Sequence, residues 1–445
     1  MIIGLAASAR IFLDIQAVYE HLFNTTFATT LIALALVWLA AALAGQPKVA
    51  VRVLAFSFVP AFAAAFFVVA PFADIKASLP DVLAGLLFEL VVLCLFCRLF
   101  VSMLGQVRRL DDAATGRALI VSLCLQVAIA IPIVTSEGFG IFSDGSRIEY
   151  LYAGSSAKYF TYAGILLTVL QAGLLARRIS SAGRARGLDY LLLIVNFGMS
   201  VMSGSKGAFF LWLLGSLALV DYRAARIRRS VMFIAFLIAS VAFAWMVRVI
   251  SGFLGLNVEE FLTLALNRVF LSNDARAMAF DLRLSVQSGD GLLSESFRSL
   301  SSLFGYPPNN PPLGVHFYDH FFGVSDGNGA NASLAALIVF YSVPGSAIFP
   351  ALLAITVALL LYAAIGTVRR LFSGTVARFA VTAWGAIALQ QLSQDFLAFQ
   401  VVLPLSVFAV VILFVIDRRP TFASRPRARH CVAPLSQHHH SGAGA

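Results

Sequence analysis

The sequence predicts an all-α polytopic integral membrane protein with about 11–12 transmembrane helices, and three observations lead to that prediction. Hydrophobic residues make up 60% of the 445 residues, whereas charged residues make up only 12%. The mean hydropathy is +0.88. Eleven apolar stretches have, or nearly have, the ~20 residues that a helix needs to cross the hydrocarbon core. This composition excludes a water-soluble protein, a disordered chain and, with four cysteines, a secreted disulfide scaffold.

The predicted spans are uninterrupted apolar stretches separated by polar or basic residues. They cover residues 27–44, 53–72, 82–99, 118–134, 159–175, 190–202, 208–220, 231–247, 346–366, 375–392 and 401–416. The sixth and seventh are short, and the small residues at 203–207 between them predict a tight turn. The charges within residues 1–25 favour an amphipathic helix at the membrane interface, although a twelfth crossing is the alternative.

Lysine and arginine are concentrated in alternate loops, which predicts the orientation of the spans. The short loops on one side, together with the C-terminal tail, hold 20 basic residues, and the opposite short loops hold four. Cytoplasmic loops are generally enriched in Lys and Arg. We therefore expect a cytoplasmic C-terminus. The net charge of +10 is explained by these loops, so it does not indicate a nucleic-acid partner.

One connection is far longer than the others and predicts a functional element on the outer face. Within it, residues 333–343 form an apolar run too short to span, which favours a re-entrant or interfacial half-helix capped by Asn331 or Ser333. The chain is thus divided into an interfacial or first-helix segment at 1–25, an N-terminal transmembrane bundle at 26–247, a large external loop at 248–345, C-terminal transmembrane helices at 346–416 and a basic cytoplasmic tail at 417–445.

Arginines recur at helical intervals in the first part of this external loop. Arg268, Arg276 and Arg283 are spaced eight and seven residues apart, which places them on roughly one face of a helix. A guanidinium stays charged at physiological pH and can hold phosphate oxygens with two parallel hydrogen bonds. The row therefore predicts a binding site for a diphosphate head group. The alternative is a solvated helix whose arginines pair with the acidic residues between them.

Two histidines follow a proline-rich stretch in the same loop. His316 and His320 lie four residues apart with Asp319 between them, so one of the histidines could act as a general base toward a hydroxyl. The alternative is a histidine packed among aromatic residues at the interface. A metal site is disfavoured because the H-E-x-x-H pattern is missing and the remaining histidines lie near the termini.

Two further sets of polar residues lie within or beside the predicted spans. Glu89 is inside the third span, where a carboxylate is costly and is expected to face a cavity or a partner such as Arg98. The polar residues between 390 and 395 crowd the outer end of the tenth span. They fit either a hydrophilic cleft for a sugar chain or polar contacts between helices.

Three stretches carry a resemblance to a known family. Ser203-Gly204-Ser205-Lys206-Gly207 resembles a small-residue turn between two spans, with Lys206 where arginine is usual, and the arginine-bearing outer loop is similar as well. Residues 331–345 resemble a half-helix that ends at an aromatic residue and a glycine turn before a long span, although the sequence at 342–345 departs from that pattern. The family is the Wzy-type O-antigen or repeat-unit polymerases, close in architecture to the O-antigen ligases.

The resemblance implies a glycosyltransferase at the periplasmic face of the bacterial inner (cytoplasmic) membrane. It would transfer an undecaprenyl-diphosphate-linked glycan to a sugar hydroxyl of another lipid-linked repeat unit, in the synthesis of O-antigen or a related surface polysaccharide such as that of lipopolysaccharide. The residues expected to hold the diphosphate are Arg268, Arg276, Arg283, Lys206 and Arg147. The residues expected to orient or deprotonate the acceptor are His316 or His320, or failing those Asp319.

The same resemblance implies a metal-independent reaction without a cofactor. Its partners would be membrane lipid, a flippase and a chain-length regulator. The chain contains neither a Walker loop nor a dinucleotide glycine fingerprint, so ATP-driven work within it is not indicated. Two alternatives stay open: a ligase that moves the glycan to lipid A core, and a polysaccharide flippase or transporter.

Overall fold

The computed structural model describes residues 30–56, 64–65, 79–137, 157–183, 187–202, 214–221, 279, 295–303, 306, 312–322, 332–341 and 348–417. Within these ranges the regular elements are helices, and five are long and apolar enough to cross a membrane. They are α4 (Leu79–Val107), α5 (Asp112–Glu137), α7 (Ala157–Ala182), α18 (Ile348–Arg370) and α20 (Phe396–Asp417), the last with Pro404 inside it. The chain is therefore an all-α polytopic membrane protein, as predicted.

The remaining described helices are shorter or less apolar. They are an apolar helix at Thr30–Leu43, η1 (Pro47–Val49), α2 (Ala50–Phe56), α8 (Gly187–Met202), α15 (Arg298–Leu303), α16 (Leu313–Phe322), α17 (Leu334–Tyr341) and α19 (Thr375–Gln394). Several helices extend past the predicted spans; α4, for example, continues eight residues beyond residue 99. A helix does not have to end where its apolar stretch ends. The predicted span at 231–247 and the turn at 203–207 lie outside the described residues.

Helix α19 lies at the centre of the bundle, packed against α4, α7, α18 and α20. Most of its side chains are buried, including Phe379 and Trp384. Glycines allow two of its neighbours to approach closely. A Cβ on Gly173 of α7 would lie 1.8 Å from the Phe379 ring, and a Cβ on Gly385 would lie 2.6 Å from Ile365 of α18. Small residues at such crossings are the usual means of close helix packing in membranes.

One end of the bundle gathers arginines from several helices, and we call it the basic end. Arg177 near the end of α7 pairs with Asp112 at the start of α5 at 3.0 Å and donates to the carbonyl of Arg108, just after α4. Arg369 near the end of α18 donates to Ser102 of α4. Basic residues that the sequence places in different loops thus meet on one side of the bundle.

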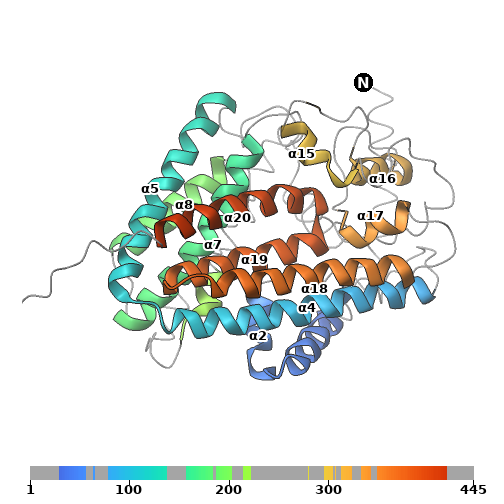
Figure 1. Cartoon of the computed structure of the whole chain (residues 1–445), viewed down its shortest axis with the longest axis horizontal. Coiled ribbons are helices and arrows are strands. Elements are labelled where there is room, and N and C mark those ends of the chain that lie inside the picture. Colours follow the sequence, from blue (N-terminus) through green and yellow to red (C-terminus); the bar gives the residue numbers. More distant parts are fainter. Residues whose placement is uncertain are drawn as a thin grey trace, which may run out of the picture.

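The opposite end, which we call the loop end, carries α15, α16 and α17 (Figure 1). Helix α17 has eight residues and forms within the predicted half-helix, too short to span. It is buried against α18 and α19. The Ser333 hydroxyl caps it by accepting the N–H of Ala336 at 3.1 Å, as predicted for that residue. The N–H of Phe396 donates to the carbonyl of Ala332 at 2.8 Å and ties α20 to this segment.

Midway along α5, α7 and α8, four uncharged polar side chains form a buried amide cluster. Its members are Gln126, Thr168, Gln171 and Asn196. The Asn196 carbonyl accepts from Gln126 Nε2 and Thr168 Oγ1, both at 2.9 Å. Its amide nitrogen donates to Gln171 Oε1 at 2.7 Å and to the carbonyl of Leu192 at 2.9 Å. Asn196 therefore uses its full hydrogen-bonding capacity to join three helices.

Glu89 and Arg98 of α4 do not face one another. Glu89 is completely buried, whereas Arg98 is exposed. Nine residues correspond to two and a half turns at about 3.6 residues per turn, which puts the two side chains on opposite faces of the helix. The predicted partnership between Glu89 and Arg98 is therefore wrong. The two residues are close in sequence, but the turn of the helix separates their side chains.

Candidate functional site

The structure describes one of the two predicted groups of site residues. The basic residues Arg147, Lys206, Arg268, Arg276 and Arg283 lie outside the described residues. His316, Asp319 and His320 all lie on α16 at the loop end. The side chain of Asp319 is outside the described part of the chain. The site is therefore built from α16 and the segments that hold it.

Helix α16 begins directly after a proline. The carbonyl of Pro312 accepts the N–H groups of Val315 and His316 at 2.9 and 3.1 Å, which closes the first turn. The N–H of Leu313 is one of the donors that a helix start leaves without a partner inside the helix. It donates to Glu295 Oε1 at 3.1 Å. A carboxylate at this position also interacts favourably with the positive end of the helix dipole.

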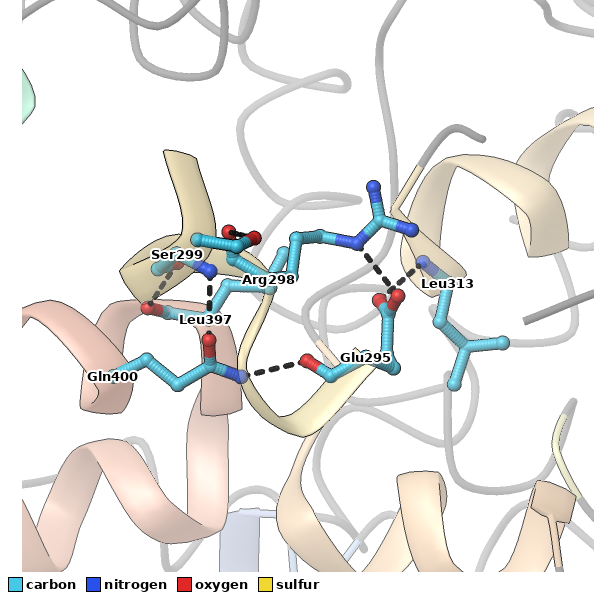
Figure 2. A network of polar contacts seen from close by, with 7 residues as sticks. Glu295, Arg298, Ser299, Leu313, Leu397 and Gln400 are labelled. Carbon is cyan, nitrogen blue, oxygen red and sulfur yellow. Dashed lines mark hydrogen bonds and ion pairs between the residues drawn. The ribbon is translucent and has the colours of Figure 1, made fainter. Parts of the chain in front are cut away.

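Glu295 forms a buried ion pair as well. Arg298 Nε donates to its second oxygen, Oε2, at 2.6 Å, while Glu295 is 2% and Arg298 7% exposed. Figure 2 shows the Arg298 guanidinium and the Leu313 nitrogen converging on the same carboxylate. Hydrogen bonds to a carboxylate are stronger than those between neutral groups. Each carboxylate oxygen thus holds a different segment, one α15 and the other α16.

Hydrogen bonds attach this arrangement to the transmembrane helices. Gln400 of α20 donates from Nε2 to the carbonyl of Glu295 and accepts the N–H of Ser299 at Oε1, both at 2.8 Å (Figure 2). The Ser299 hydroxyl donates to the carbonyl of Leu397 at 3.3 Å. The Tyr159 hydroxyl of α7 donates to the carbonyl of Ser299 at 2.8 Å. We call the whole set the loop-end network: Glu295, Arg298, Ser299, Leu313, Gln400 and Tyr159.

The two histidines of α16 have different surroundings. The His316 ring meets Phe340 of α17 edge-on at 6.4 Å between ring centroids. Its Nε2 is shielded from solvent and has no hydrogen-bond partner among the residues that the structure describes. His320, one turn later, is exposed. His316 therefore matches the aromatic-packing alternative, and His320 is the histidine that a substrate could reach.

The polar residues at the end of α19 make local contacts. Gln390 Nε2 donates to Gln394 Oε1 at 3.1 Å. Asp395 caps α20, because its Oδ1 accepts the N–H groups of Leu397 and Ala398 at 3.0 and 3.1 Å. This contact gives Asp395 a structural role at the start of α20.

Sequence reasoning missed Glu295 and Gln400. The i,i+3 spacing of Glu295 and Arg298 was a signal that an ion pair could form on a short helix. Gln400 lies in an apolar helix, where a polar side chain usually has a partner. Within the described ranges, no group of three or more His, Cys, Asp or Glu residues could hold a metal ion.

The comparisons with known proteins add no assignment. No family model, no curated protein and no solved structure matches this chain.

Proposed function

We propose that the chain is a glycosyltransferase that polymerises undecaprenyl-diphosphate-linked oligosaccharide repeat units at its loop end. In this proposal the basic end faces the cytoplasm, following the preference of Lys and Arg for that side, and the loop end faces the periplasm of a bacterial inner membrane. The separation of the two ends in the described bundle supports this orientation. The partners proposed are the lipid-linked glycan, membrane lipid, a flippase and a chain-length regulator.

The reaction needs a proton acceptor and a cationic site for the leaving group. The acceptor hydroxyl oxygen attacks the anomeric carbon of the donor glycan, its proton passes to His320, and the bond from that carbon to the diphosphate oxygen breaks. The diphosphate leaves with the bonding electrons. Arg268, Arg276 and Arg283 are proposed to stabilise its negative charge, with Lys206 and Arg147 as further donors. His320 returns its proton to solvent after the transfer.

One observation carries this proposal more than any other. The exposed His320 lies on α16, and the buried carboxylate of Glu295 holds the start of this helix at the loop end. A lipid-linked substrate would place its diphosphate at this level of the membrane, with the lipid beside the helices and the glycan outside. A general base held at that boundary fits a reaction between two lipid-linked glycans.

The first test is deletion of the gene, followed by electrophoresis of the surface polysaccharide. A single repeat unit on each lipid A core is the expected result for a polymerase. Bare core would instead indicate a ligase, and an unchanged ladder would refute both activities.

Variants of the histidines test the site within an active protein. His320→Ala should abolish the polymer ladder at normal protein levels. The matched control is His316→Phe, which keeps an aromatic ring against Phe340 and should retain the ladder. A full ladder from His320→Ala would remove the base assignment.

The arginines form the second half of the site. Arg276→Ala or Arg283→Ala should abolish polymerisation while the protein still inserts. Lysine at either position should rescue only partly, because an ammonium group loses the two-point contact with phosphate. Full polymer after replacement of Arg268, Arg276 and Arg283 together would refute the diphosphate site.

A further inference from the structure

We infer that Glu295 is a positioning residue, whose carboxylate sets the place of α16 and therefore of His320. The test of this inference by the polymer ladder rests on the proposed function, whereas the test by hydrogen exchange in α16 does not. Glu295 thus has a task beyond stabilising the fold through its ion pair with Arg298.

The two carboxylate oxygens of Glu295 bind two different segments. Oε2 accepts from Arg298 Nε at 2.6 Å, and Oε1 accepts the first N–H of α16, from Leu313, at 3.1 Å. An ion pair between Glu295 and Arg298 that served only α15 would not require the contact between Oε1 and Leu313. Because Glu295 is 2% exposed, water does not compete for either oxygen.

Glu295 is itself held in place by α20. Gln400 Nε2 donates to its backbone carbonyl at 2.8 Å, and the Gln400 carbonyl oxygen accepts the N–H of Ser299 at the same distance (Figure 2). The membrane helix α20 thus fixes the main chain of Glu295, and the Glu295 side chain fixes the start of α16. A continuous series of hydrogen bonds runs from the bundle to the helix that bears the histidines.

The start of α16 and His320 belong to the same short helix. His320 lies seven residues after Leu313, which is about two turns or ~10 Å along the helix axis. A short helix moves largely as a rigid body, so displacement at its first residue is passed on to His320. Misplacement of a reacting group by about 1 Å can lower the rate by roughly 100-fold.

The experiment compares an acceptor with a non-acceptor of similar shape at position 295. Glu295→Gln keeps an oxygen that can accept from Leu313, whereas Glu295→Met has a comparable length without a strong acceptor. Both remove the negative charge, so the difference between them isolates the hydrogen bond. Hydrogen exchange of the segment Leu313–Phe322 is measured by mass spectrometry on the purified protein in nanodiscs, and the polymer ladder is measured in cells.

The expected results follow from the loss of one hydrogen bond to a buried acceptor. In Glu295→Met, exchange in α16 should be faster by roughly tenfold or more relative to Glu295→Gln, and the ladder should be lost in the first and largely kept in the second. Equal exchange of α16 in the two variants would overturn the inference, whatever the ladder shows.

A charge swap gives a second comparison in which the ion pair is retained. Glu295→Arg combined with Arg298→Glu keeps opposite charges three residues apart but places a side chain without any acceptor opposite Leu313. The double variant should have the melting temperature of the wild type. Hydrogen exchange in α16 should nevertheless stay fast, and the polymer ladder should stay absent. Wild-type exchange in α16 would show that the ion pair alone is sufficient and would overturn the inference.

If the wild-type gene produces no ladder while α16 responds as expected, the proposed function fails and the positioning of α16 stands.

Discussion

The amide cluster and the loop-end network are both buried and polar, yet they are built from different chemistry. The amide cluster lies midway along α5, α7 and α8 and contains only amides and a hydroxyl. The loop-end network contains a carboxylate and a guanidinium, both more than nine-tenths buried. The amide cluster joins membrane helices to each other, and the loop-end network joins membrane helices to α15 and α16.

The difference shows how position along the bundle selects the polar group. A charge in the middle of a bilayer is costly, whereas an uncharged amide needs only hydrogen-bond partners. Near the end of the bundle the Glu295 carboxylate is tolerable, because it accepts a hydrogen bond from Leu313 in addition to the ion pair with Arg298. In both networks one side chain holds two other segments: the Glu295 carboxylate does so with charge-assisted hydrogen bonds, and the Asn196 amide does so with neutral ones.

Removing one ion from the loop-end network should have the largest effect. Arg298→Ala leaves the Glu295 carboxylate buried without its counterion, and the expected loss is ~3–5 kcal/mol of unfolding free energy. The loss can be measured by thermal or steric-trapping unfolding in detergent. Arg117→Ala, at an exposed position on α5, is the matched control and should change little. A loss below about 1 kcal/mol for Arg298→Ala would mean that the pair is not structurally important.

A steric change at the crossing of α7 and α19 should have the next largest effect. Gly173→Ala places a methyl group against the Phe379 ring, and overpacking of this kind costs ~1–3 kcal/mol. Gly164→Ala on the same helix is the control, because a Cβ there meets nothing within 4 Å. Neither polar network joins α7 to α19 at this crossing, so the difference between the two variants reports on side-chain packing there. Equal stability of the two variants would contradict the close approach of these helices.

Breaking the amide cluster should cost less than breaking the ion pair. Asn196→Leu removes the central side chain, and hydrogen bonds between membrane helices contribute ~0.6 kcal/mol on average, so a total of about 1–2 kcal/mol is expected. Ile194→Leu, at an exposed position of the same helix, serves as the control. A loss as large as that of Arg298→Ala would remove the distinction between neutral and charged networks.

The smallest effect should come from an ion pair at the surface of the basic end. Asp112 is 64% exposed and pairs with Arg177 at 3.0 Å. Exposed pairs contribute less than about 1 kcal/mol, and salt screens them. Asp112→Asn should therefore shift the melting temperature only slightly, and the shift should vanish at high salt. A large shift that persists in salt would show that exposure does not decide the strength of these pairs.

The sequence was sufficient for features that depend on local composition. Apolar runs of sufficient length predict spanning helices, and the short run at 333–343 predicted the helix at Leu334–Tyr341 with its Ser333 cap. These predictions were accurate because burial in a bilayer requires a certain length and a helix start requires an acceptor.

Features that join distant residues could not be predicted in this way. The contact between Glu295 and Gln400 links residues 105 apart, so no local pattern shows it. The different surroundings of His316 and His320 depend on Phe340, which reaches α16 only through the packing of α17. The prediction about the arginine row, outside the described residues, stays a prediction.

Pro404 lies four residues after Gln400 in α20. A proline has no N–H to donate, so the backbone carbonyl of Gln400 lacks the donor that residue 404 would supply in a regular helix. The side chain of Gln400, which binds Glu295 and Ser299, therefore lies on a turn of α20 that lacks one backbone hydrogen bond. Bending at this turn would move Glu295 and the start of α16 together, while the part of α20 after Pro404 keeps its place among its neighbours.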